Sequence, residues 1–194
     1  PMTKIHELET TRLRLRQWID ADKVPFAQLN ADVRVMEFFP NTLSKLRSDA
    51  VATQIHHAIA QNGWGFWAVD VKGKHPFIGM VGLNRPAYEL PFGPCVEVGW
   101  RLGYPYWGHG YATEAAKAAI AFGFENLNLE EIVSFTAIVN VRSQAVMERL
   151  GMMRAPNTFN HPSVKKGSLL EEHCLYTLTQ KDWQPVTERP LKSI

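Results

Sequence analysis

Hydrophobic and polar residues change their spacing along the chain in a way that separates strands from helices. One-by-one alternation, or a run rich in β-branched and aromatic residues, predicts a β-strand. Such segments occupy residues 11–18, 64–71, 77–83, 96–102, 132–139 and 170–178. Apolar residues at helical spacing predict helices at residues 20–30, about 44–61, 112–123 and 141–150. The resulting order, β-α-α-β-β-β-α-β-α-β, places the chain in the α/β (α+β) class.

Several helix ends carry residues suited to capping. Asp20 is a candidate N-cap for the first helix, and Thr42 or Ser44 for the second. Asn140 can cap the last helix in the same way. After that helix, residues 154–168 are polar and are predicted to form a connection without regular structure.

The segment from the strand at 96–102 to the helix at 112–123 contains a two-glycine turn, Gly108-His109-Gly110. Alanines line one face of the helix, so it can lie close to a sheet. The free N–H groups and the dipole at its start suit an anionic phosphate ligand. The alternative is that the glycines only turn the chain from strand to helix. The spacing excludes a Walker A loop, and Thr113 stands where a Rossmann fingerprint needs glycine or alanine.

The composition is that of an ordinary globular protein of one domain, with 194 residues, 45% hydrophobic and 21% charged. A net charge of +2 is too small to indicate direct binding to nucleic acid or to a membrane surface. Cys95 and Cys174 lack metal-binding spacing, so we expect no metal site and a reduced, cytoplasmic setting. No apolar run approaches the ~20 residues that span a bilayer, and residues 1–4 lack the pattern of a signal peptide.

Four motifs resemble those of the GNAT acetyltransferases, and in particular of the RimJ/RimL-type enzymes that acetylate ribosomal-protein N-termini. They are LETTRLRLR at 8–16, GMVGL at 79–83, YWGHGYATEA at 106–115, and NVRS at 140–143 followed by ERLGM at 148–152. The resemblance covers nearly the whole chain. It implies a GNAT fold with one mixed central β-sheet flanked by helices and splayed between the fourth and fifth strands, 96–102 and 132–139. Residues 1–194 would form a single domain, with a core at about 8–179 and tails at 1–7 and 180–194.

The resemblance also implies an activity, the acetyl-CoA-dependent transfer of an acetyl group directly to a primary amine. The cofactor is acetyl-CoA without a metal, held by a phosphate loop and by two residues beside the pantetheine arm. The residues expected to bind it are Trp107, Gly108, His109, Gly110, Tyr111, Ala112, Thr113, Asn140 and Ser143. Trp107 departs from the family's polar residue at that position. The alternatives are that Asn140 is only a helix cap and that Ser143 is only a solvated residue of the first turn.

Glu97 is the candidate general base, because a carboxylate amid Phe92, Trp67 and Trp100 would have a raised pKa. The alternative is an ion pair between Glu97 and Arg101 or a neighbouring arginine.

Ser143 is the candidate general acid. The family's usual proton donor is a tyrosine four residues further on, where Met147 stands here and cannot donate a proton. That departure motivates a second hypothesis, a CoA-binding module without transferase activity. Neither cysteine matches an acyl-carrier position, so a covalent acetyl-enzyme is not expected.

The acceptor side is less defined. By the resemblance, His161 and His173 lie near the last strand, which borders the acceptor groove, although a histidine in such a position is more often a surface or packing residue. Arg34, Phe38 and Phe39 would shape the acceptor pocket. The acceptor is a protein N-terminus, an amino acid or a small amine, and the residues do not specify which. They do not specify the oligomeric state either.

Overall fold

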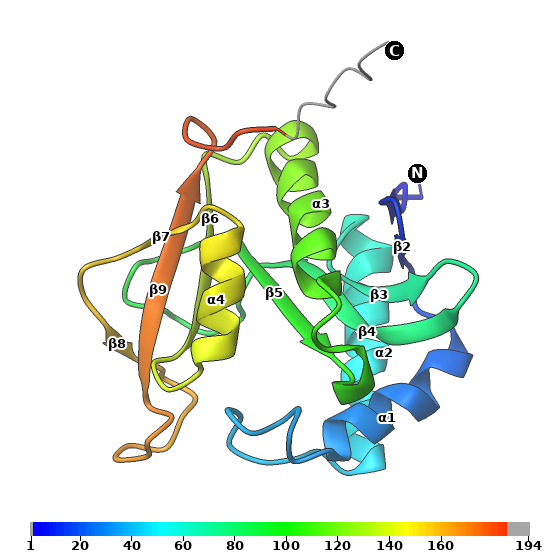
Figure 1. The fold of residues 1–194 in the computed structure, drawn as a ribbon, viewed down its shortest axis with the longest axis horizontal. Helices are drawn as coiled ribbons and strands as arrows, with labels where there is room; N and C mark the ends of the chain where they lie inside the picture. The colour runs from blue at the N-terminus through cyan, green and yellow to red at the C-terminus, as the bar shows by residue number, and fades with distance from the viewer. Residues whose placement is uncertain (1, 186–194) are drawn as a thin grey trace.

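A central β-sheet organises the computed structural model, which describes residues 2–185 (Figure 1). Its strands have the spatial order β1-β2-β3-β4-β5-β6-β9-β7, and β8 pairs with β9. The strands are β1 (Leu8–Glu9), β2 (Leu13–Arg16), β3 (Phe66–Val71), β4 (His75–Asn84), β5 (Glu97–Leu102), β6 (Glu131–Ala137), β7 (Met153–Arg154), β8 (Phe159–Asn160) and β9 (Glu172–Thr179). The helices are η1 (Asp20–Asp22), α1 (Lys23–Ala31), α2 (Lys45–Asn62), η2 (Tyr104–Tyr106), α3 (Tyr111–Asn126) and α4 (Val141–Arg149). Residues 1 and 186–194, which belong to the expected tails, lie outside the described part.

The sheet is mixed, because β5 and β6 are parallel while the other neighbouring strands are antiparallel. These two are the expected fourth and fifth strands. A single residue pair, Glu97 with Val133, joins them near their starts. Beyond it the strands separate, and α3 and α4 lie at the opening (Figure 1). The predicted mixed sheet with its splay is thereby confirmed.

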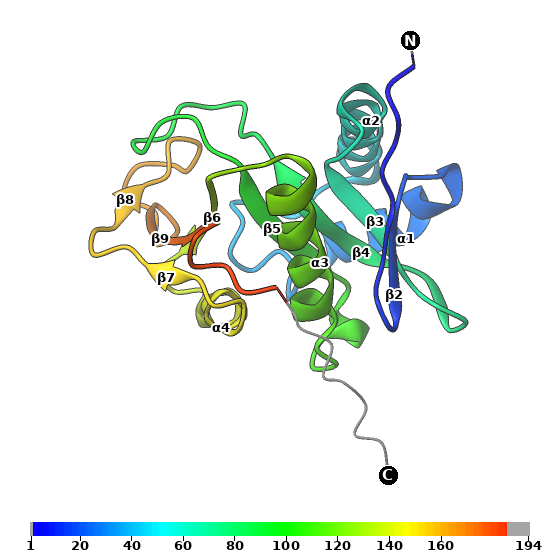
Figure 2. The same ribbon diagram turned by 90° about the horizontal axis from the view of Figure 1, so that it is seen from above.

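Helices cover both faces of the sheet. Figure 2 shows α3 and α4 on one face, and α1, α2 and the loop between β4 and β5 on the other. The alanine-lined side of α3 lies against the sheet as predicted, since Ala115, Ala116 and Ala119 have no exposed surface. A Cβ atom at Gly123 would lie 2.8 Å from Ile132 Cδ1 on β6, so the side chains of the sheet leave no room for an added carbon unless they move.

Two local predictions were wrong. Asp20 does not cap the first helix, which begins after a 3-10 turn, because the carboxylate of the buried Asp22 takes the hydrogen bond from Ile19 N at 2.9 Å. The connection at 154–168 is not wholly irregular, since β8 pairs with β9 and Arg154 belongs to β7. The polar composition of that connection concealed short strands that gain their hydrogen bonds from β9.

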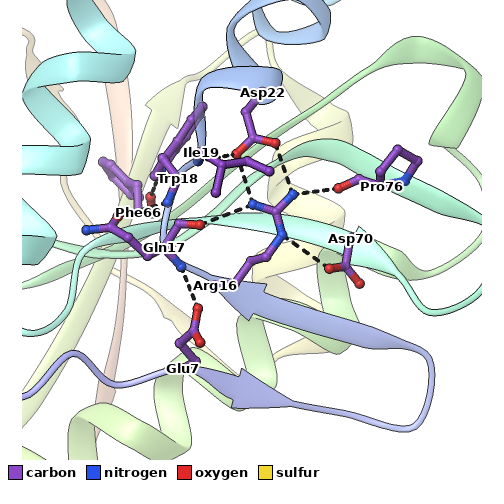
Figure 3. A network of polar contacts seen from close by, with 9 residues as sticks. All are labelled: Glu7, Arg16, Gln17, Trp18, Ile19, Asp22, Phe66, Asp70 and Pro76. Carbon is purple, nitrogen blue, oxygen red and sulfur yellow. Dashed lines mark hydrogen bonds and ion pairs between the residues drawn. The ribbon is translucent and has the colours of Figure 1, made fainter.

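Arg16 joins four parts of the fold at the outer end of the sheet (Figure 3). Its guanidinium donates to both carboxylate oxygens of Asp22 at 2.9 and 3.0 Å and to Asp70 Oδ2 at 3.2 Å. It also donates to the carbonyl oxygens of Gln17 and Pro76. The Asp22 side chain is 2% exposed, so its charge depends on this partner. The network fixes β2 against β3, β4 and the start of α1.

We expect Arg16→Met to lower the free energy of unfolding by about 3–5 kcal/mol, because it leaves the buried Asp22 carboxylate without its cation. Urea unfolding measures the loss. Arg14→Met is the matched control on the same strand, since Arg14 and its partner Glu9 are 57% and 65% exposed and solvent screens their interaction. Equal losses in the two variants would show that the network does not stabilise the fold.

Candidate active site

The turn between β5 and α3 presents backbone donors at the open end of the splayed strands. Gly108 and Gly110 have φ values of 79° and 77°, in the region that favours glycine. The first intrahelical bond of α3 runs from Glu114 N to Gly110 O at 3.0 Å. The N–H groups of residues 111–113 therefore point out of the helix end, where an anion can accept them.

Trp107 holds this turn against the sheet and supports a cation. Its indole Nε1 donates to Leu102 O at 3.0 Å. The guanidinium of Arg142, on α4, lies 4.0 Å from the centre of the Trp107 ring. Arg142 thus brings a positive charge to the position where the family pattern has a polar side chain. Sequence reasoning missed this residue, although its place two residues after the cap of α4 was a usable signal.

The first turn of α4 lies beside the opening. Asn140 caps the helix as predicted, accepting from Ser143 N at 3.2 Å. Asn140 Nδ2 donates to Thr136 Oγ1 at 2.9 Å and to Ser143 Oγ at 3.1 Å. Because Ser143 Oγ accepts this bond, its own proton remains available to another acceptor.

Glu97 lies at the point where β5 and β6 meet. Burial raises the pKa of its carboxyl to about 7, and the neighbouring Asn84 amide acts in the opposite direction. Within residues 2–185, Glu97 Oε2 is buried without a hydrogen-bond partner, and no ion pair of Glu97 is found. Arg101, the alternative partner, donates instead to Asn30 Oδ1 at 2.9 Å. The carboxyl is therefore removed from water, and its Oε2 can accept a further hydrogen bond.

Residues 12–153 match the family model of the acetyltransferase (GNAT) domain. The FsC-acetyl coenzyme A-N(2)-transacetylase of Aspergillus fumigatus is 28% identical over 185 residues, covering 91% of this chain and 77% of the relative. A GNAT-family acetyltransferase structure from Bacillus anthracis superposes with a TM-score of 0.75 at 22% identity, covering 91% of this chain and 99% of the other. RimL, the ribosomal L7/L12 alpha-N-protein acetyltransferase, was solved with coenzyme A and has a TM-score of 0.71 at 15% identity over 91% and 99%.

The chain belongs to the GNAT acetyltransferase family. It is an acetyl-CoA-dependent N-acetyltransferase whose structural neighbours include ribosomal-protein acetyltransferases. The geometry fits the cofactor: a Cβ at Gly108 would meet no atom within 4 Å, so the turn is open on the side where a pyrophosphate would approach. The part of the chain between residues 2 and 185 has no cluster of three or more metal-ligating His, Cys, Asp or Glu side chains. In that same part, no helix has the length and apolarity needed to cross a bilayer.

The aromatic residues near Glu97 are only in part those that the sequence predicted. Trp67 and Trp100 are in register across β4 on the opposite face of the sheet, where Trp67 packs against Phe122 of α3. Phe92 does lie on the Glu97 side, where its ring centroid is 6.0 Å from that of Phe135. The raised pKa was expected, but two of its three proposed neighbours were wrong, because side chains alternate across the sheet.

His161 and His173 lie together on the face of the sheet that carries Phe135. Their ring centroids are 4.8 Å apart, and each ring contacts Phe135 and Phe159. Burial, and then the neighbouring His173, lower the pKa of His161 to about 4. Burial also lowers the pKa of His173. Both rings are therefore neutral near pH 7 and form part of an aromatic wall.

Arg34 and Phe39, two of the other residues expected at the acceptor pocket, have different partners. The Arg34 guanidinium lies 3.8 Å from the centre of the Tyr104 ring and pairs with Asp32 at 2.7 Å. Phe39 packs against the Arg101 guanidinium, 4.4 Å from its ring centre. Met147, at the family's tyrosine position, is 1% exposed and belongs to the core. Phe39 is thus the residue of this group that lies on the same side of β5 as Glu97.

The Glu97 pKa predicts a pH-dependent stability. A rise from 4.5 to about 7 means that the folded protein keeps a proton that the unfolded chain releases in that window. Stability therefore falls as pH rises from about 4.5 to 7, by up to roughly 3 kcal/mol. Glu97→Gln removes this term, so the variant should gain stability relative to wild type between pH 5 and pH 8.

Urea unfolding of both proteins at the two pH values measures this gain. Tyr88 and Cys95 also face Glu97, but burial, followed by the Glu97 charge, raises the pKa of each. Neither titrates in the window, so neither changes the comparison. A difference between variant and wild type that is the same at pH 5 and pH 8 would contradict a buried Glu97 carboxyl.

Proposed function

We propose that this chain transfers an acetyl group from acetyl-CoA directly to a primary amine in a ternary complex, with Glu97 as general base and Ser143 as general acid. The observation that carries the proposal is the desolvated Glu97 carboxyl at the junction of β5 and β6, whose Oε2 has no hydrogen-bond partner within residues 2–185. The acceptor is a protein N-terminus, an amino acid or a small amine.

The open end of the splay supplies the cofactor site. The N–H groups of residues 108–113 would donate hydrogen bonds to the pyrophosphate oxygens at the positive end of the α3 dipole. Arg142, stacked on Trp107, adds a cation that reaches the same region. When bound, acetyl-CoA supplies the activated acetyl thioester. Asn140 and Ser143 line the α4 side of the gap in which its pantetheine arm lies.

Glu97 has the properties of a base for an amine that arrives as an ammonium ion. A pKa of about 7 leaves a large part of the carboxyl ionised at neutral pH, while its basicity is raised above that of an ordinary glutamate. The unpartnered Oε2 gives the ammonium N–H an acceptor. Removal of that proton leaves the lone pair with which the amine attacks the thioester carbonyl.

We propose that Ser143 donates a proton to the departing thiolate as the tetrahedral intermediate collapses, and that the second proton of the acetylated nitrogen returns to Ser143. Asn140 Nδ2 donates to Ser143 Oγ at 3.1 Å, which orients the hydroxyl and leaves its hydrogen free to point elsewhere. The Met147 thioether is buried in the core and cannot take this role.

A covalent acetyl-cysteine is disfavoured by the state of both thiols. Burial raises the pKa of Cys95 to about 11, with the Glu97 and Glu131 charges acting in the same direction. Burial also raises the pKa of Cys174. Both remain protonated at neutral pH, and a thiol is a much weaker nucleophile than a thiolate.

Gly110→Val tests the cofactor loop. At φ 77° a β-branched residue is strained, so the turn that presents the N–H groups would be distorted. We expect affinity for CoA, measured by calorimetry, to fall at least tenfold. Gly73→Val is the matched control, since Gly73 has φ 70° but lies in the turn between β3 and β4. Unchanged CoA affinity in folded Gly110→Val would remove this assignment.

The proposed chemistry is tested by thiol release from acetyl-CoA with a panel of amines that includes N-terminal peptides of ribosomal proteins. Glu97→Gln should lower kcat/KM by about 10²–10⁴-fold at neutral pH and recover partly as pH rises, because free amine becomes abundant. Ser143→Ala should slow thiol release without that recovery. Glu125→Gln, an exposed carboxylate on α3, serves as control.

Wild-type rates for both variants across pH 6–9 would show that positioning alone drives the reaction. Tight CoA binding without thiol release for any amine would favour a CoA-binding module instead.

A further inference from the structure

Two buried polar atoms on the acceptor side of β5 have no partner within the described residues. Between residues 2 and 185, three buried side-chain nitrogen or oxygen atoms lack a hydrogen-bond partner, and two of them are Glu97 Oε2 and Arg101 Nε. Residues 97 and 101 are four positions apart on one strand, so their side chains project from the same face. Buried polar groups are rarely left unsatisfied, which makes the pair a marker of a ligand.

Arg101 is held in place without an anion. Its Nη1 donates to Asn30 Oδ1 at 2.9 Å, and Asn30 Nδ2 donates in turn to Ser48 Oγ at 3.0 Å. Phe39 covers one side of the guanidinium. No ion pair of Arg101 occurs within residues 2–185. Burial lowers the pKa of Arg101 to about 10, so the group remains a cation at neutral pH.

An apolar surface lies between the two charges. Gly99 stands midway on β5, and its neighbours in register are Gly82 on β4 and Phe66 on β3. A Cβ at Gly99 would lie 3.1 Å from a carbon of the Phe66 ring. The ring therefore lies over the glycine and separates the carboxyl from the guanidinium.

From this arrangement we infer that the acceptor is a zwitterion, with an amine that binds Glu97 and a carboxylate that binds Arg101 across an apolar spacer. The inference rests on the proposed function, because it takes Glu97 as the amine site. The guanidinium offers free donors in the planar fork that suits a carboxylate. One ligand would then neutralise both buried charges, neither of which has a counter-ion in the described fold.

The spacing selects the kind of zwitterion. Four residues of extended strand separate the two Cα atoms by about 13 Å, at about 3.3 Å per residue. In an α-amino acid the amine and carboxylate are only about 3 Å apart, whereas the Phe66 ring lies between the Glu97 carboxyl and the Arg101 guanidinium, so a longer spacer fits the pair better. An ω-amino acid with an apolar or aromatic spacer can reach further and can pack against Phe66.

A matched pair of acceptors tests the inference: 4-(aminomethyl)benzoate and the neutral 4-(aminomethyl)benzamide, which have the same size and the same amine. We expect wild-type kcat/KM to favour the acid at least tenfold, the range of a hydrogen bond to a charged group. Arg101→Met should bring that ratio close to one, and Arg101→Lys should retain part of it. Arg14→Met, on β2 three strands away from β5, should leave the ratio as in wild type.

Calorimetric binding of the same two compounds to CoA-loaded wild-type protein needs no turnover and no variant. Tighter binding of the acid supports the inference even if the panel of amines releases no thiol, which would count against the proposed function alone. Equal binding of acid and amide, or an acid preference that survives in folded Arg101→Met, would overturn it. Circular-dichroism melting curves establish that each variant is folded.

Discussion

The parallel contact between β5 and β6 is confined to one residue pair, and most of the site depends on that restriction. Had the two strands stayed in register, their backbone groups would have satisfied each other along their whole length. Because they part after Glu97 and Val133, a gap opens toward their carboxyl ends. The starts of α3 and α4 both border this gap. The turn proposed to bind phosphate, the capped first turn of α4 and the proposed base at the junction all depend on the same divergence.

Charged side chains have different surroundings at the outer end of the sheet and in its middle. At the outer end, Arg16 is satisfied by two carboxylates and two carbonyl oxygens, and it fastens the elements together. In the middle, Glu97 and Arg101 are buried on one strand and remain separate. A fold that needed these two only for stability would pair or replace them, because isolated buried charges are costly. Their retention fits groups whose partners arrive with the substrate.

The sequence predicted those features of the fold that depend on local pattern. The alanine face of α3, the cap at Asn140 and the divergence of the fourth and fifth strands were all anticipated, since periodicity, capping chemistry and family motifs encode them directly. The wrong expectations have a common physical cause. Asp20 was expected to cap the first helix, and Trp67 and Trp100 were expected beside Glu97. Such choices are decided by partners distant in sequence, namely Arg16 in the first case and the face of the sheet in the second.

Partners distant in sequence also explain why the sequence did not predict Arg101 and Arg142 as site residues. Arg101 entered only as a partner for Glu97, because the chain does not reveal that Asn30, on α1, binds it. Arg142 shows how a departure from a family motif can be offset elsewhere. Trp107 replaces the polar residue of the family's phosphate loop. Its ring, however, forms the surface against which the Arg142 guanidinium stacks. The stack also ties α4 to the turn before α3. Any ligand that draws Arg142 toward its phosphates therefore acts on the helix that carries Ser143, which links cofactor binding to the position of the proposed acid.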